Sequence, residues 1–423
     1  MMIPTGLRGL FYIYLLLNQL YGPALQACTI FFGADSQRVL AAANKSHDNL
    51  ATQFAVYADE EGKFDRIYLG RRVPQGFQNA GGMNEHGLWY DGADLPERSD
   101  IANHHNKPSI QGELCEFTLE KCKTLAEVRT MYETYYSPHW QGHSMWGDAT
   151  GKSMIIEYGN DDVVFLEDEQ SFQVMTNFYL QDTENQKWKH CYRYSAATQM
   201  LLDADEEYTL PLFRSILDAT HQVGIPPTLL SAIYNLKTRS ITLYNFYNYD
   251  EAVVLDVDTL LQRGSEKYDI PEYFSGITLD WPENGEVVNS DAVLLEWRGD
   301  AQNYQVQLST TPNFGNVLTF VTENDIDSSG VTLALMTIFI PFGLLPILKR
   351  NSFPIRELIV MLMLAILLVG CLNPLFSPYE SSNQKHELLI ENLDALTTYY
   401  WKVQIEAESG IVNKSLTRSF QVE

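Results

Sequence analysis

The sequence CTIFFGADSQRVLAAANKSHDN occupies residues 28–49. Residues 29–32 and 38–43 are rich in apolar side chains, and a turn that contains Gly and Asp separates them. Two such runs around a short turn predict a β-hairpin. Cys28 stands directly before the first run, so the first strand of the hairpin would hold this cysteine at a fixed edge.

The residues ahead of Cys28 have the pattern of an export signal. Arg8 supplies a positive charge, residues 10–17 (LFYIYLLL) form a short apolar core, and residues 23–27 (PALQA) end on a small side chain. These are the parts of a cleavable signal peptide. We therefore expect residues 1–27 to be removed and Cys28 to become the N-terminal residue. A buried N-terminal strand or helix is the alternative.

The composition is that of a globular and strongly acidic protein. The 423 residues include 54 Asp and Glu against 29 Lys and Arg, a formal net charge of −25. Such a surface repels a phosphate backbone, so we expect no nucleic-acid partner. The length allows roughly two or three domains. The five cysteines form no CxxC pair and the histidines follow no metal-ligand spacing, so we expect no metal site.

Residues 28–257 alternate between strand-like and helical patterns. Short β-rich runs bounded by Gly, Asn and Asp occupy residues 29–32, 38–43, 54–58, 153–158, 173–175, 241–246 and 252–255. Apolar side chains at helical spacing occupy residues 112–136, 191–203 and 210–220. The fold class predicted from these patterns is α+β, with a first domain over residues 28–269.

The pattern changes after residue 270 to strand-like runs alone. The segments LEWRG (295–299), YQVQLST (304–310) and LTTYYWKVQ (396–404) resemble a fibronectin type III domain. That resemblance implies a β-sandwich over residues 270–423, in which strands from the two ends of the region pair.

Two apolar stretches interrupt this region. Residues 331–348 and 358–376 each lack a charged side chain over a length that can cross a hydrocarbon core of about 30 Å. Basic residues lie in the loop 349–357 between them, which places that loop in the cytoplasm. We expect a transmembrane hairpin inserted in the sandwich, with both domains on the extracytoplasmic side, in the periplasm or at the cell surface. Two buried core helices are the alternative.

Cys28 is the residue best placed for chemistry, because as N-terminal residue it would carry a thiol beside its own α-amine. An α-amine titrates near pH ~8 and can act as the base that activates the thiol. The Cys28 hairpin and four later elements are similar, in the same order, to the choloylglycine hydrolase and isopenicillin-N acyltransferase group. Those elements are GGMNEHGLWYDG (81–92), WGDATGKSMIIEY (146–158), FQVMTNFY (172–179) and SAIYNLKTRSITLYNFYNYDEAVVLDV (231–257). The resemblance covers residues 28–257 and implies an N-terminal-nucleophile (Ntn) amidase with an αββα sandwich.

The same resemblance implies roles for four more residues. Asp48 would bond the α-amine of Cys28, and the side-chain amide of Asn84 would help to form the oxyanion hole. Asn177, in VMTN, would be the second polar residue of the site. Lys45 stands where the family more often has arginine, so it keeps the charge and loses the planar fork. The hairpin also has one extra residue before Asp48.

We therefore expect an exported, membrane-tethered hydrolase that cleaves a linear, non-peptide amide of a small N-acyl substrate through a thioester on Cys28. No cofactor is implied, and the sandwich would bind an envelope polymer or a protein partner. Two alternatives remain open. One is an acyltransferase that uses the same site. The other is an inactive binding module in which residues 25–28 (LQAC) act as a lipobox and Cys28 carries lipid.

Overall fold

The computed structural model describes residues 28–323 and 384–423, apart from residues 48, 97–106, 111, 138–141, 160–162, 168–169, 183–190, 224–225, 275, 290, 302 and 409. The expected signal peptide (1–27) and the two apolar stretches (331–348 and 358–376) lie outside the described residues. In the part of the chain that is described, no helix is long and apolar enough to cross a membrane.

Two large antiparallel sheets form the N-terminal part. Neighbour to neighbour, the first sheet begins with β10 (Phe172–Met175), β1 (Thr29–Ala34), β2 (Val39–Ser46), β11 (Thr228–Asn235), β12 (Ser240–Asn245) and β13 (Glu251–Asp256). The second sheet runs through β14 (Glu266–Asp269), β3 (Thr52–Tyr57), β4 (Arg66–Val73), β5 (Gly76–Asn84), β6 (Trp89–Asp94), β7 (Gly142–Gly147), β8 (Ser153–Tyr158) and β9 (Val163–Leu166). The predicted N-terminal hairpin is β1 paired with β2.

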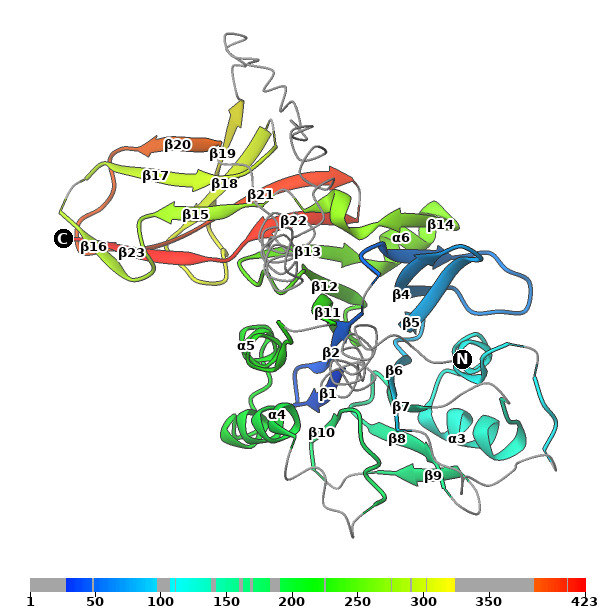
Figure 1. Cartoon of the computed structure of the whole chain (residues 1–423). Coiled ribbons are helices and arrows are strands. Elements are labelled where there is room, and N and C mark those ends of the chain that lie inside the picture. Colours follow the sequence, from blue (N-terminus) through cyan, green and yellow to red (C-terminus); the bar gives the residue numbers. More distant parts are fainter. Residues whose placement is uncertain are drawn as a thin grey trace, which may run out of the picture.

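Helices cover the outer faces of both sheets, which gives the order helix, sheet, sheet, helix (Figure 1). The outer helices are α4 (Tyr192–Asp203) and α5 (Leu210–Thr220) on the first sheet, and α2 (Leu114–Leu119) and α3 (Leu125–Thr134) on the second. The alternation along β1 explains the layering, because successive side chains of a strand point to opposite faces. Ile30 and Phe32 enter the core between the sheets, whereas Phe31 packs on Phe213 of α5.

One predicted helix is two helices in the structure. The prediction of a single helix over residues 112–136 is wrong, because α2 ends at Leu119 and α3 begins at Leu125. Thr124 accepts a hydrogen bond from the Glu127 backbone, and the Glu127 side chain accepts one from the Thr124 backbone. This capping box starts a new helix at a point where the apolar spacing alone would continue the first.

The C-terminal part is a sandwich of two sheets around its own core. One sheet consists of β15 (Thr278–Trp281), β17 (Val293–Arg298) and β20 (Lys385–Ile390). The other contains β16 (Glu286–Val288), β18 (Asn303–Ser309), β19 (Val317–Glu323), β21 (Thr398–Glu408), β22 (Ile411–Ser415) and β23 (Arg418–Val422). Pairing of β17 with β20 and of β18 with β21 joins the chain before residue 324 to the chain after residue 383.

The first sheet continues from the N-terminal part into the C-terminal part. β13 pairs with β22, so the backbone ladder crosses from one core to the other without a break (Figure 1). Buried Glu251 strengthens this junction, because it accepts from Asn413 Nδ2 at 2.7 Å and from the Gly276 N–H at 2.9 Å. The change to strand-like runs after residue 270 therefore marks the start of a second hydrophobic core, and the sheet itself continues across it. The chain between β13 and β15 forms α6 (Val257–Arg263), β14 and a short 3₁₀ helix (Ile270–Tyr273).

Candidate active site

Cys28 precedes β1 and lines a cavity of about 610 Å³ between the two large sheets. Its side chain is buried, with 5% exposed. Polar side chains on the wall are Lys45, Ser46, His47, Asn49, Thr52, Arg71, Gln78, Asn79, Asp94, Glu113 and Glu116. Apolar side chains on the wall include Leu69, Tyr90, Ala93, Leu95, Leu229 and Leu230. A thiol in this position can meet a substrate that has both an apolar and a polar part.

Asn177 anchors the backbone nitrogen of Cys28. The Cys28 N–H donates to Asn177 Oδ1 at 2.9 Å, and Asn177 Nδ2 donates to the Asp94 carbonyl at 3.0 Å. Asn177 follows β10, and β10 pairs with β1, so these two residues from distant parts of the chain lie at the same sheet edge. The structure thus brings together Cys28 and Asn177, two of the predicted site residues.

Lys45 lies on β2 and contributes charge to the same cavity. Its Nζ donates to the carbonyls of Ala80 at 3.1 Å and Gly92 at 2.9 Å, and it forms an ion pair with the carboxylate of Asp91. An ammonium group has three hydrogens, and these three acceptors use all of them. Lys45 can therefore act on Cys28 through its charge and has no hydrogen left to donate to a substrate.

Burial dominates the electrostatics around the thiol. It raises the pKa of the Cys28 thiol, Lys45 opposes that rise, and the carboxylates of Asp91 and Asp94 add to it. Burial also raises the pKa of Asp91 to about 6, although the neighbouring ammonium lowers it. With this thiol pKa, the attacking sulfur needs a base to accept its proton.

Of the other two predicted site residues, the structure describes only Asn84. Asp48 lies outside the described residues. Asn84 lies at the end of β5, outside the set of residues that line the cavity. Its Nδ2 donates to the carbonyls of Leu119 and Cys122, both at 2.9 Å, and its Oδ1 accepts from backbone N–H groups of the following turn. Both amide hydrogens are therefore occupied in holding α2 against the β5–β6 turn, so Asn84 has none to donate to an oxyanion.

Two residues at the site, Asp94 and Arg193, lie outside the motifs identified in the sequence. Asp94 lines the cavity only two residues beyond the GGMNEHGLWYDG element, so a longer comparison of that element could have included it. Arg193 lies in the first turn of α4 and contacts the Cys28 carbonyl and Asn177. Its position in an ordinary amphipathic pattern carries no signal of this contact.

A buried histidine–glutamate pair bonds the backbone on both sides of Asn177. His143 on β7 and Glu157 on β8 are fully buried, with Nδ1 and Oε1 2.9 Å apart. His143 Nε2 donates to the Thr176 carbonyl at 2.6 Å. Glu157 accepts from the N–H groups of Leu180 at 2.9 Å and Gln181 at 3.1 Å. Both residues belong to the second sheet, and their hydrogen bonds hold the chain after β10 on both sides of Asn177.

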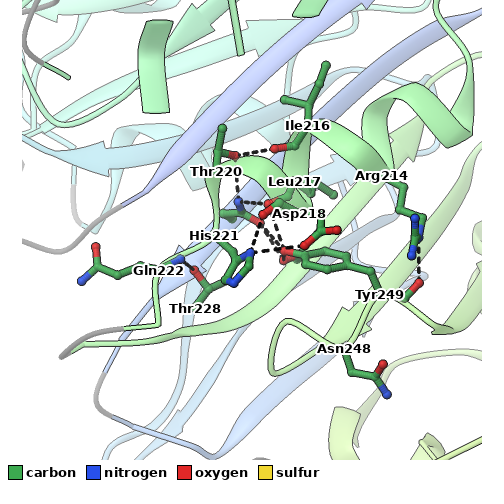
Figure 2. Close-up of polar contacts among 12 residues, drawn as sticks. Arg214, Ile216, Leu217, Asp218, Thr220, His221, Gln222, Thr228, Asn248 and Tyr249 are labelled. Carbon is green, nitrogen blue, oxygen red and sulfur yellow. Dashed lines mark hydrogen bonds and ion pairs between the residues drawn. The ribbon is translucent and has the colours of Figure 1, made fainter. Parts of the chain in front are cut away.

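A polar network fixes β2 from its outer face. Asn44, next to Lys45, donates from Nδ2 to the Leu217 carbonyl at 2.9 Å, and its Oδ1 accepts from Ser231 Oγ at 2.6 Å. Tyr249 places its hydroxyl 3.1 Å from the same Leu217 carbonyl at the end of α5 (Figure 2). Since neighbouring strand residues point to opposite faces, anchoring Asn44 on the helix side directs Lys45 into the cavity. Among the described residues, no group of three or more His, Cys, Asp and Glu side chains could hold a metal ion.

The chain is structurally similar, at low sequence identity, to known amide hydrolases. Penicillin V acylase from Agrobacterium tumefaciens matches with a TM-score of 0.48 and 18% identity, over 57% of this chain and 92% of that chain. Two variants of conjugated bile acid hydrolase from Clostridium perfringens match 57% of this chain. Their TM-scores are 0.45 and 0.44, their identities 15% and 13%, and the shares of their own chains 96% and 97%. No family model and no curated protein matches the sequence.

Proposed function

We propose that the protein is an N-terminal-cysteine hydrolase that cleaves a linear, non-peptide amide bond of a small N-acyl substrate. The observation that carries this proposal is the setting of Cys28, which faces a cavity of about 610 Å³ and places its backbone nitrogen 2.9 Å from Asn177 Oδ1. Removal of residues 1–27 would convert that nitrogen into an α-amine. The amine would then already have an acceptor that orients it beside the thiol.

In the proposed reaction, the α-amine of Cys28 takes the thiol proton while Sγ attacks the carbonyl carbon of the amide. The amine then gives this proton to the leaving nitrogen, the C–N bond breaks, and the acyl group stays on Sγ as a thioester. Water attacks the thioester, and the same amine accepts a proton from it. The carboxylic acid leaves and the thiol is restored.

Other residues would support these steps without forming bonds to the substrate carbon. Lys45 favours the thiolate by its charge. Asn177 orients the α-amine, and its second Nδ2 hydrogen, which bonds none of the described residues, is assigned to the oxyanion of the tetrahedral intermediate. Asp48 is proposed as a second partner of the α-amine.

We extend the proposal to the location of the protein. The segments 331–348 and 358–376 would cross a membrane with loop 349–357 in the cytoplasm, and both folded parts would lie on the extracytoplasmic side. Pairing of strands from both sides of residues 324–383 supports an insertion, because the chain leaves and re-enters the same sandwich. This sandwich would bind an envelope polymer or a protein near the membrane.

The first test is the N-terminus of the protein purified from membranes, by intact mass and Edman sequencing. A free Cys28 as first residue is the expected result. An uncleaved chain, or a Cys28 that carries diacylglycerol or an N-acyl group, has no free α-amine and would refute the mechanism.

The second test is hydrolysis of a panel of N-acyl amides that vary in the acyl and amine parts. Activity should disappear in Cys28→Ala and persist in Cys191→Ala, a matched control that removes a different free cysteine near the site. Saturable transfer of the acyl group to an added amine acceptor, with the amide and not the free acid as main product, would identify an acyltransferase. A Cys28→Ala variant that remains active would exclude this cysteine as nucleophile.

A further inference from the structure

The wall of the Cys28 cavity is acidic where α2 begins. Glu113 directly precedes this helix and Glu116 lies in its first turn, and both side chains line the cavity. Asp94, at the end of β6, is a third carboxylate on the wall. Among the described residues, no lysine, arginine or histidine forms an ion pair with any of these three carboxylates. Within that part of the chain, their charge is therefore not neutralised by direct pairing.

The basic side chains on the wall are bound to other partners. Lys45 pairs with Asp91, and its remaining hydrogens go to two backbone carbonyls. His47 and Arg71 also have partners of their own. The cavity thus presents carboxylates to a ligand, whereas its cations are already engaged. A cavity lined by an excess of one charge concentrates ligands of the opposite charge.

A chain of hydrogen bonds holds the Glu116 carboxylate in place. The Tyr90 hydroxyl donates to Asn79 Oδ1 at 2.9 Å, and Asn79 Nδ2 donates to Glu116 Oε1. No described residue donates to Glu116 Oε2. Burial raises the pKa of Glu116, and the nearby carboxylate of Glu113 adds to this rise. A cation in the cavity would oppose both effects, because it favours the ionised carboxylates.

The buried hydroxyl of Thr52 indicates, independently of the carboxylates, that a polar ligand group belongs in this cavity. Thr52 lines the cavity, and only 6% of the residue is exposed. It lies two residues before Phe54 on β3, so both side chains point to the space between the sheets. Among the described residues, its Oγ1 has no hydrogen-bond partner. Since a buried hydroxyl without a partner is destabilising, a ligand that supplies one would gain affinity.

We propose that the substrate carries a positive charge, an ammonium or guanidinium group that Glu113 and Glu116 bind while the amide lies at Cys28. The two glutamates would then determine specificity, because the same carboxylates repel a substrate whose non-reacting part is anionic. This inference rests on the proposed function, to which it adds a class of substrate, the basic N-acyl amides.

The test compares amides that differ mainly in charge. N-octanoylputrescine, N-octanoylbutylamine and N-octanoyl-γ-aminobutyrate have a cationic, a neutral and an anionic amine part of similar length. A second series moves the charge to the acyl part, with ω-aminooctanoyl, octanoyl and suberoyl groups on butylamine. Hydrolysis by the wild-type protein gives kcat/KM. Calorimetry with the Cys28→Ala protein gives the affinity for the intact amides and needs no catalysis.

In at least one series, kcat/KM of the cationic member should exceed that of the neutral member about tenfold or more, and the anionic member should be the poorest. Glu116→Gln keeps an oxygen that accepts from Asn79. This variant and Glu113→Gln should each reduce the ratio of cationic to neutral kcat/KM, and the double variant should bring the ratio close to one. Glu133→Gln is the matched control, because it removes the same charge from an exposed position on α3 outside the cavity. It should leave the ratio unchanged.

The inference and the proposed function can fail separately. Hydrolysis without a preference for the cationic member in either series would overturn the inference and leave the proposed function standing. Charge-dependent binding to the Cys28→Ala protein, without hydrolysis by the wild-type protein, would have the opposite meaning. A preference that survives in the double variant would also overturn the inference, because these carboxylates would then not be its source. A protein that neither binds nor hydrolyses the cationic amides would refute both.

Discussion

The His143–Glu157 pair allows a sharp prediction, because its loss should loosen one short segment of the site. In Glu157→Gln the side chain keeps its shape but has one acceptor oxygen instead of two. The wild-type carboxylate accepts from Leu180 N–H through Oε1 and from Gln181 N–H through Oε2. The amide group can satisfy only one of these two donors, so the other is left buried without a partner.

The size of the effect follows from that single unpaired donor. A buried backbone N–H without an acceptor destabilises a protein by about 1–3 kcal/mol. If the NH₂ group of the new amide faces His143, it can donate to Nδ1 of a neutral ring, which limits the damage to that one donor. Glu157→Ala removes every acceptor and leaves His143 Nδ1 without its partner, so we expect a destabilisation of about 3–5 kcal/mol for that variant.

Hydrogen exchange locates the effect, and denaturant unfolding measures it. The amides of Leu180 and Gln181 should exchange faster in Glu157→Gln, whereas amides of α3 should not change. A double-mutant cycle with His143→Asn should give a coupling energy above about 0.5 kcal/mol, since the two side chains are in contact. Unchanged exchange at both amides, together with unchanged stability, would refute the role assigned to the pair.

Two further substitutions separate charge from packing at the site. In Lys45→Met, Asp91 loses the cation that lowers its pKa. The pKa of Asp91 in the folded protein is already about 6, above the unfolded value, so the protonated form contributes stability in acid that is lost as the pH rises. Without Lys45 the folded pKa rises further, and the free energy of unfolding should therefore continue to fall above about pH 6. Stability curves against pH should show this fall, and Lys45→Met with Asp91→Asn should lack it. Asn84→Ala should destabilise the fold by roughly 2–4 kcal/mol through its lost hydrogen bonds. The kcat of the folded Asn84→Ala protein should be nearly unchanged. A large loss of kcat without a matching loss of stability would show that Asn84 takes part in catalysis.

The family resemblance implied the layers of the N-terminal part, whereas local patterns predicted only its strands and helices. In β1, Ile30 and Phe32 lie in the core between the sheets and Phe31 lies on the helix side, although all three side chains are apolar. The motif order also singled out Cys28 and Asn177, and the structure places these two residues in contact. Their roles in catalysis stay predictions. Short motifs can be read from the sequence because they are properties of neighbouring residues.

Contacts between distant residues could not be predicted in the same way. Arg193 lies 165 residues from Cys28, and nothing in its own neighbourhood distinguishes it from a surface arginine of an amphipathic helix. Asn84 shows the opposite problem, since an amide in a Gly-rich turn looks the same whether it faces a substrate or caps a helix. In the structure the Asn84 amide bonds the carbonyls of Leu119 and Cys122, and these contacts depend on where α2 ends.

The pairing of β13 with β22 also has a consequence for how the molecule would work at a membrane. Separate domains joined by a linker usually move relative to each other. Here a continuous backbone ladder and the buried Glu251–Asn413 contact join the two cores, so bending between them would break hydrogen bonds. The proposed membrane insertion follows β19, the strand at the far end of this sheet from β10. A tether at that end would hold the Cys28 cavity at a fixed distance from the bilayer. Val412→Pro would break hydrogen bonds between β13 and β22. The rate of hydrolysis should then change more for membrane-bound substrates than for soluble ones.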